Sequence, residues 1–366
     1  MTEEATAPVK KRTVLRVIGR ILLILLTAIV ALAAALAITV NTICNGPSPA
    51  ARELFVTTVL ESGQLKFVAS LFLSQEEITE IVNRTSMGEI DTAIDTELIT
   101  VGAEESSEEH YDENGIELIE ISGRTYFAKL MIVRDPAQLK LATTYPWTEY
   151  GKELGKLVED SGAIAGVNGG LYKSDANKGG SPYGIAVCEG EIQYNRPEGW
   201  RGLYLIGFDE DNILQILSLE GMTAGDLEKL VAEKKIRDAV AFQDEATDAN
   251  NHFVPLVING VARELNGQGS GANPRTAIGQ RADGSVLLLV TDGRGAAGHL
   301  GATASDLISI MLEYGAVNAA NLDGGSSSCM YYDGAYEMTS VTLYYANASW
   351  RLPTAFVVTK AGEQDG

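Results

Sequence analysis

The feature that most constrains this chain is an uncharged apolar run near its N-terminus. Residues 21–40 contain no charged side chain, and Thr27 and Thr39 are their only polar members. A helix of about 20 residues spans roughly 30 Å, which matches the hydrocarbon core of a bilayer. We therefore expect one transmembrane helix at residues 21–40, with the rest of the chain folding as a separate body.

Charge patterning predicts the orientation of that helix. Residues 1–20 carry five basic and two acidic residues, a balance of +3, whereas the whole chain has a formal charge of −21, so the remainder carries −24. Basic residues flank membrane helices on the cytoplasmic side. The pattern predicts a single-pass cell-membrane protein with a cytoplasmic tail at 1–20 and an extracellular body. Because an acidic body repels phosphate backbones, no nucleic-acid partner is expected.

A cleavable signal peptide is the alternative interpretation of the same segment. Ala35-Leu36-Ala37 has the small-x-small form of a cleavage site. The apolar part of a signal peptide usually measures only about 7–15 residues, however, and this run is longer. The length favours a retained anchor.

The cysteines and histidines argue against a thiolate or histidine metal site. Cys44, Cys188 and Cys329 are widely spaced and form no CxxC pair, and the three histidines form no HExxH motif. Neither a disulfide framework nor a zinc site is indicated. The acidic body could hold calcium through carboxylates, although it has no EF-hand spacing. No other cofactor is expected.

Composition divides the rest of the chain into a helical module, a linker and a larger domain. Apolar residues recur at helical spacing within 41–84, which predicts a stalk or packing module, and Ser74-Gln75-Glu76-Glu77 can form a capping box. Residues 85–114 are polar and acidic and predict a linker. Residues 115–360 contain many short strand-like runs and few helical ones, which predicts an α+β domain with a mixed sheet. Residues 361–366 form a short tail.

Three strand-like runs end in the same way, with a short polar side chain followed by glycine. They lead into Asn168-Gly169-Gly170, Asp292-Gly293-Arg294 and Asp323-Gly324-Gly325. A helical segment, capped by Thr303 and stopped by Gly315, joins the last two. A strand–helix–strand unit has parallel strands, so the two aspartates should emerge at one sheet edge, about 5–10 Å apart. That separation suits the carboxylate pair of a retaining or inverting glycosidase, although a single Asp-Gly is commonly just a turn.

Two arginines are candidates for binding an anion. Arg275 follows Pro274 and precedes a strand-like run, where its guanidinium could hold a phosphodiester through two hydrogen bonds. A surface salt bridge is the ordinary alternative. Arg294, beside Asp292, is the second candidate. His299 could relay a proton, although a single loop histidine is commonly incidental.

Four blocks of sequence, taken together, resemble the phosphodiester glycosidase family. They are GVNGGLY at 166–172, NPRTAIG at 273–279, TDGR at 291–294 and NLDGGSS at 321–327, and residues 351–355 resemble the closing strand of the family. The resemblance covers about residues 115–360 and implies an α+β fold that hydrolyses sugar-1-phosphodiesters. Ser326 stands where the family usually has a third glycine, and Tyr172 stands where phenylalanine is frequent. These departures leave the substrate open.

The resemblance also implies which residues form the site. Asp323 and Asp292 would divide the acid–base or nucleophile work, in an order that the sequence leaves open. The residues expected to bind substrate are Asn168, Gly169, Arg275, Thr276, Arg294, Gly324, Gly325 and Ser326. The expected protein is a membrane-anchored extracytoplasmic hydrolase acting on a phosphodiester of a cell-surface, exopolysaccharide or cell-wall glycan. The alternative is a non-catalytic module that binds glycan or scaffolds polymer assembly.

Overall fold

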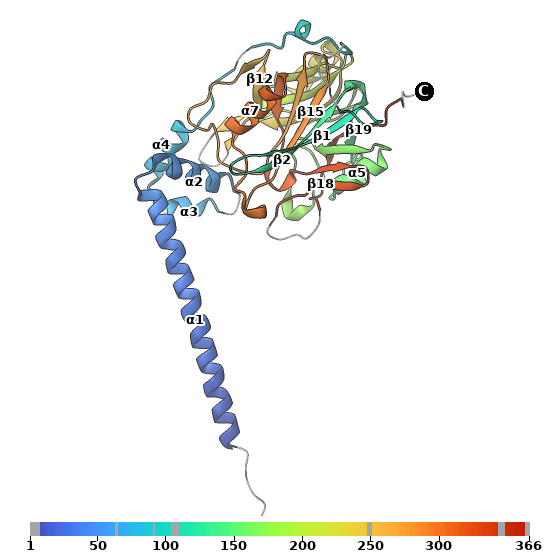
Figure 1. Cartoon of the computed structure of the whole chain (residues 1–366). Helices are drawn as coiled ribbons and strands as arrows, with labels where there is room; N and C mark the ends of the chain where they lie inside the picture. Colours follow the sequence, from blue (N-terminus) through green and yellow to red (C-terminus); the bar gives the residue numbers. More distant parts are fainter. Residues whose placement is uncertain are drawn as a thin grey trace, which may run out of the picture.

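The first helix extends away from the rest of the molecule as a single rod (Figure 1). The computed structural model describes residues 8–62, 65–90, 92–103, 110–246, 251–342 and 348–362. Helix α1 (Pro8–Asn45) is longer than the predicted segment at both ends. Its part Val14–Asn45 has the length and composition needed to cross a membrane. Every side chain from 14 to 39 is exposed, so α1 is not the buried core helix of a globular domain.

Three short helices form a module at the end of α1. They are α2 (Pro49–Glu61), α3 (Phe67–Ser70) and α4 (Gln75–Arg84). Helix α4 begins at the predicted capping box, in which Ser74 and Glu77 bond to each other's backbone N–H. The apolar faces of the three helices pack together with the last turns of α1, through Val40, Cys44, Val56, Val59, Leu60, Ala69, Leu73, Ile78, Ile81 and Val82. The module and the end of α1 therefore share one small core.

The described part of the predicted acidic linker lies along the surface of the larger domain. Gly88 N–H donates to the carbonyl of Glu264 at 2.8 Å, and Thr100 N–H donates to the carbonyl of Ala282 at 2.7 Å. A short 3-10 turn, η1 (Thr96–Leu98), lies between these contacts. The segment is thus docked along its described length; the acidic run at 104–109 lies outside the described residues.

Three antiparallel sheets make up the larger domain, and they confirm the α+β class. The seven-stranded sheet has the order β1 (Ile116–Ser122), β2 (Phe127–Val133), β15 (Val286–Thr291), β14 (Thr276–Arg281), β16 (Ala316–Asn321), β12 (Pro255–Ile258) and β13 (Val261–Ala262). One five-stranded sheet has the order β18 (Ala335–Met338), β17 (Met330–Tyr332), β4 (Ala165–Asn168), β19 (Thr354–Val358) and β3 (Leu139–Thr143). The other has the order β6 (Glu191–Arg196), β5 (Gly184–Cys188), β9 (Ile236–Gln243), β7 (Leu203–Asp209) and β8 (Leu214–Ser218). A small ribbon pairs β10 (Glu245–Ala246) with β11 (Asn251–His252).

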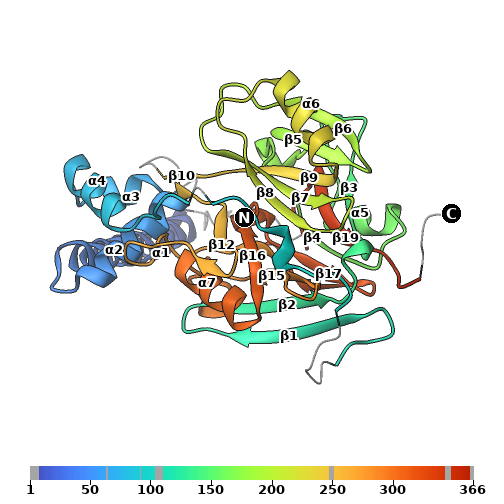
Figure 2. The ribbon, with the colours of Figure 1, turned by 90° about the horizontal axis from the view of Figure 1, so that it is seen from above.

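The three sheets share one core, and a helix backs each of them. Apolar side chains from all three sheets meet in that core, among them Leu288, Phe356 and Phe208. Helix α7 (Ala304–Glu313) packs on the outer face of the seven-stranded sheet, α5 (Leu154–Asp160) on the sheet of β4, and α6 (Ala224–Glu233) on the sheet of β9 (Figure 2). This covering buries both faces of the central strands.

The apolar spacing of residues 147–158 predicts one helix over that range, but helix α5 begins only at Leu154. The residues before it are extended because they bond to distant segments. Gly151 N–H donates to the carbonyl of Lys178 at 2.7 Å, and Lys152 N–H donates to the carbonyl of Leu352 at 3.0 Å. Tertiary hydrogen bonds thus replace the helical ones that the local pattern favours.

The strand–helix–strand unit has the predicted orientation but not the predicted neighbours. Strands β15 and β16 both pair antiparallel with β14, so they run parallel to each other. Thr303 and Asp306 form a capping box at the start of α7, and Gly315 ends it with a φ of 83°. Because β14 lies between the two parallel strands, their ends are two strand spacings apart, about 10 Å.

Candidate active site

All four sequence blocks meet at one edge of the seven-stranded sheet. Strands β15 and β16 end there at Thr291 and Asn321, and the antiparallel strand β14 begins there at Thr276. Strand β4 of the neighbouring sheet reaches the same place, since the side chain of Asn168 bonds to Thr276 and to the backbone of Asp323. The fold thus gathers segments that lie up to 155 residues apart in the chain.

Asp323 is the carboxylate at the centre of this edge. Its Oδ1 accepts a hydrogen bond from its neighbour Gly324 N–H at 3.0 Å, and the Ser327 hydroxyl also bonds to the carboxylate. Burial raises the pKa of Asp323 to about 7, against the lowering effect of these hydrogen bonds and of the Arg294 charge. A carboxyl group that titrates near neutral pH suits proton transfer.

Arg294 is an exposed residue whose guanidinium reaches in beside Asp323, where burial lowers its pKa. Its Nη1 donates to Ser326 Oγ at 2.7 Å, and its Nε donates to Asn273 Oδ1 at 3.4 Å. The guanidinium lies directly over Gly325, where a Cβ atom would stand only 2.6 Å from Nη2. The residue itself is exposed and has a φ of 53°, so a tight loop aims its side chain back across the Asp323 turn. Gly325 has a φ of 64°, which favours glycine, and its lack of a Cβ leaves room for this guanidinium.

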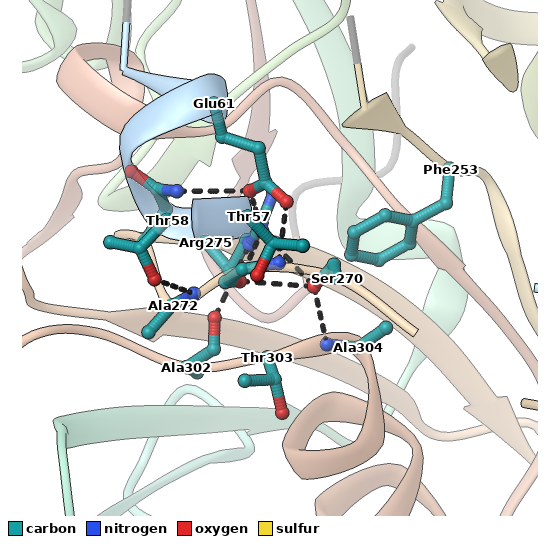
Figure 3. A network of polar contacts seen from close by, with 12 residues as sticks. Thr57, Thr58, Glu61, Phe253, Ser270, Ala272, Arg275, Ala302, Thr303 and Ala304 are labelled. Carbon is teal, nitrogen blue, oxygen red and sulfur yellow. Dashed lines mark hydrogen bonds and ion pairs between the residues drawn. The ribbon is translucent and has the colours of Figure 1, made fainter. Parts of the chain in front are cut away.

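Arg275, the first candidate for the phosphate-binding cation, is buried and already engaged. Its Nη2 pairs with the carboxylate of Glu61 from α2 and also donates to Gly271 O at 2.8 Å and Ser270 Oγ at 3.2 Å (Figure 3). The guanidinium stacks 4.9 Å from the ring centre of Phe253. Its side chain is 7% exposed. The cation is therefore held by protein acceptors, and the alternative of a surface salt bridge is wrong because the pair is buried.

Asp292 bonds to the backbone of β2 and pairs with a histidine. Its Oδ1 accepts from the N–H of Phe127, on the side of β15 that carries β2, and its Oδ2 lies 2.6 Å from Nδ1 of His299. The His299 side chain is 30% exposed. A carboxylate on one ring nitrogen fixes the imidazole orientation and leaves Nε2 for proton exchange. The sequence predicts two cooperating carboxylates. In the structure one of them, Asp323, has no histidine partner among the described residues, whereas the other, Asp292, is paired with His299.

Asn168, Thr276 and Gly169 support the edge from inside. Asn168 is fully buried, donates to Asp323 O at 2.6 Å, and accepts from the hydroxyl of Thr276 at 2.7 Å. Thr276 is buried too. A Cβ on Gly169 would lie 2.5 Å from Thr354 Oγ1, so this glycine allows β4 to approach β19 closely. All three residues are predicted to bind substrate. In the structure their side chains or backbone contact other parts of the protein and support the turn that contains Asp323.

The candidate site is not one of the two main hollows of the described residues. Among those residues, no group of three His, Cys, Asp or Glu side chains is placed to hold a cation, and calcium binding stays a prediction. Two hollows of about 880 and 490 Å³ lie elsewhere, beside α6 and beside α5. None of the predicted site residues lines either hollow. The candidate site is defined by its convergent side chains.

Sequence reasoning missed Glu61, Asn273 and the partner of His299. Asp292 and His299 are seven residues apart on a glycine-rich loop, and that proximity was a signal for a carboxylate–histidine pair. Glu61 lies 214 residues before Arg275 and no spacing rule connects them. The burial of Arg275 is what demands a carboxylate partner, and burial is visible only in the structure.

Comparisons with known proteins agree with the motifs and the fold. The family model described as phosphodiester glycosidase matches residues 161–359. The zebrafish N-acetylglucosamine-1-phosphodiester alpha-N-acetylglucosaminidase catalytic domain, auto-inhibited by its pro-peptide, superposes with a TM-score of 0.53 at 15% identity, over 72% of this chain and 87% of that one. At this identity the likeness shows the fold alone.

A curated relative matches a short part of the chain. The SPbeta prophage-derived uncharacterized protein YomE of Bacillus subtilis (strain 168) is 45% identical over 64 residues, which is 18% of this chain. The match spans 10% of that protein. The family model, by contrast, covers more than half of this chain and contains all four blocks that meet at the sheet edge. The chain belongs to the phosphodiester glycosidase family.

Proposed function

We propose that this protein is a hydrolase that releases a sugar from a sugar-1-phosphodiester. The observation that carries the proposal is that Asp323, a carboxyl group with a pKa of about 7, stands beside the guanidinium of Arg294. Family membership supplies the reaction class, and the zebrafish enzyme by its name acts on N-acetylglucosamine-1-phosphodiester. A proton-transfer group beside an anion-binding group is what hydrolysis of such a substrate requires.

The reaction breaks the bond between the anomeric carbon and the bridging phosphate oxygen. Water adds its oxygen to the anomeric carbon, and its proton passes to a base on the protein. The leaving group departs as a phosphate monoester, and its negative charge is stabilised by a nearby cation. One sugar and one phosphate monoester result, and no oxidant or cofactor is consumed.

Arg294 is the residue that we assign to the phosphate group. It is exposed, and its guanidinium lies over Gly325 and bonds to Ser326, so an anion held there would also face the Gly324–Gly325 backbone. Arg275, in contrast, has its Nη2 occupied by Glu61 and acts from behind the turn. This reverses the order in which the sequence ranked the two arginines.

The two proton-transfer groups that we assign are Asp323 and the His299–Asp292 pair. Asp323 titrates near neutrality, and the imidazole is oriented by a carboxylate 2.6 Å away. Groups placed on two strands about 10 Å apart leave room for a water molecule and a sugar ring between them. Asp292 then acts through the histidine and not directly on the substrate.

The proposed location is a membrane surface. Helix α1 has the length and hydropathy of a membrane span, and residues 1–20 carry the net positive charge typical of a cytoplasmic flank. The body would then lie outside the cytoplasm, with access to phosphodiester-linked surface or wall glycans. The alternative, a non-catalytic glycan-binding or scaffolding module, predicts binding of the same glycans without turnover.

Incubation of the full chain in detergent with a panel of sugar-1-phosphate methyl esters tests the proposal. Released sugar is identified by mass, with N-acetylglucosamine-1-phosphate methyl ester as the first substrate. We expect turnover by the wild type and loss of at least about 100-fold in kcat for Asp323→Asn. Binding of the panel without sugar release would replace the hydrolase by the glycan-binding alternative.

A further inference from the structure

Glu61 at the end of α2 is a hub of hydrogen bonds to the loop that precedes β14. Its Oε1 accepts from Gly271 N–H at 2.5 Å, and its Oε2 accepts from Asn273 Nδ2 at 2.9 Å and from Arg275 Nη2. Figure 3 shows the carboxylate reaching from the helix toward Arg275. One side chain of the N-terminal module therefore binds three residues of the 271–275 segment.

The contact between α2 and this loop is close and buried. The side chains of Glu61 and Arg275 are 5% and 7% exposed. Thr58 Oγ1 accepts from Ala272 N–H at 3.0 Å, one turn before Glu61 (Figure 3). A Cβ on Gly271 would lie 2.5 Å from the backbone of Thr57 and Thr58, so only glycine lets the helix approach. The loop is shaped to receive this helix.

The same loop contacts two parts of the proposed site, the turn that follows Asp323 and the side chain of Arg294. The carbonyl of Pro274 accepts from Gly325 N–H at 2.8 Å, which fixes the turn that follows Asp323. Asn273 Oδ1 accepts from Arg294 Nε at 3.4 Å, while its Nδ2 donates to Glu61. Hydrogen bonds through segment 273–275 thus connect Glu61 with the Asp323 turn and with Arg294.

We propose that Glu61 is a positioning residue of the active site, and that the module at 41–84 is part of the catalytic unit rather than a passive stalk. The carboxylate orders segment 271–275, and that segment in turn orients Arg294 and the Asp323 turn. Glu61 touches neither substrate nor reacting atoms. The inference deepens the proposed function and rests on it for its kinetic consequences, while its structural consequence stands without any turnover.

Removal of the Glu61 charge tests the inference in the full chain. Glu61→Gln keeps the size of the side chain but loses the anion that pairs with Arg275 and accepts from Gly271. We expect kcat to fall at least 10-fold with KM changed less than 3-fold, and Glu61→Asp to recover part of the loss. Glu76→Gln, an exposed glutamate of α4 in the same module, serves as the matched control and keeps wild-type values.

Hydrogen–deuterium exchange provides a readout that needs no substrate. In Glu61→Gln the amides of 270–276 and 323–328 should exchange faster than in the wild type, while those of β7 and β9 stay unchanged. Unchanged exchange at both segments would overturn the inference even if the protein hydrolyses nothing. Turnover equal to or above that of the wild type would also overturn it, and an increase would identify Glu61 as a group that blocks the site. Loss of turnover in Asp323→Asn is a separate result that concerns only the proposed function.

Discussion

The side-chain amide of Asn168 donates to the backbone carbonyl of Asp323 at 2.6 Å and so joins two sheets at the candidate site. Asn168 ends β4 of a five-stranded sheet, and Asp323 follows β16 of the seven-stranded sheet. The bond fixes the backbone of the turn. The Asp323 side chain therefore stays at the edge of the sheet and does not rotate into solvent. This fixed, partly buried position is the reason why the carboxyl group holds its proton up to neutral pH.

Asp323→Asn should change how stability depends on pH. Burial raises the folded pKa of Asp323 to about 7, whereas an unfolded aspartate titrates near 3.9. The folded wild type therefore loses stability as pH rises from about 4 through 7, because ionisation is harder in the folded state. Asparagine has no proton to lose. Between pH 5 and pH 8 the variant should gain on the order of 2 kcal/mol relative to the wild type, less than the full shift implies because Asp323 is partly exposed.

Urea unfolding of both proteins at pH 5 and pH 8 in detergent measures this difference. Asp175→Asn, at an exposed aspartate, serves as the control and should show no such gain. A difference in the free energy of unfolding that stays constant between the two pH values would mean that Asp323 has an ordinary pKa in the folded protein.

The two arginines should respond to substitution in opposite ways. Arg294 is exposed, so Arg294→Lys should leave stability within about 0.5 kcal/mol but raise KM for a sugar-1-phosphodiester about 10-fold or more, because lysine cannot form two parallel hydrogen bonds to phosphate. Arg275→Met removes one partner of a buried ion pair and leaves the Glu61 carboxylate without its cation, so it should lower the free energy of unfolding by about 3 kcal/mol.

A comparison of a charged with a neutral substrate distinguishes loss of phosphate binding from a general loss of substrate binding. A neutral aryl glycoside of the same sugar lacks the phosphate, so its KM should change little in Arg294→Lys. Equal increases of KM for both substrates would remove Arg294 from phosphate binding. A melting temperature of Arg275→Met equal to that of the wild type would show that the pair with Glu61 contributes no stability.

The His299–Asp292 pair should affect turnover and not binding. His299→Ala removes the imidazole, and Asp292→Asn leaves it without the carboxylate that orients it at 2.6 Å. We expect each to lower kcat about 100-fold or more with KM nearly unchanged, as for other oriented histidine bases. His110→Ala, at an exposed histidine, is the control. Wild-type kcat in both pair variants would leave Asp323 as the only proton-transfer group.

Local signals predicted much of this site. The caps of α4 and α7, the boundaries of β15 and the parallel direction of β15 and β16 all follow from residues that are close in sequence. Such features depend on hydrogen bonds within a few residues and on the handedness of the crossover. The motifs converge at one sheet edge because β15 and β16 run in the same direction.

Strand order and burial could not be predicted. Strands β14 and β15 form a local hairpin, but the pairing of β14 with β16 joins distant residues such as Ala277 and Asn321, and it is this pairing that places β14 between the two parallel strands. The same holds for the burial of Arg275, which depends on a helix 214 residues earlier. Asp292 follows β15 at the predicted edge, but the bond that orients its side chain comes from the Phe127 N–H of β2, which no local pattern indicates. Each of these outcomes is decided by tertiary neighbours and not by local propensity.

The proposed membrane topology predicts a specific pattern of protease protection. Helix α1 exposes apolar side chains from 14 to 39, and its end packs into the module through Val40 and Cys44. In spheroplasts, added protease should remove an epitope placed after Gly366 and leave one placed before Met1 intact, because the basic flank stays in the cytoplasm. The full chain should also remain in the membrane fraction after alkaline carbonate washing. Detection of a shortened, freely soluble body that has lost the N-terminal epitope would instead identify residues 1–37 as a cleaved signal peptide.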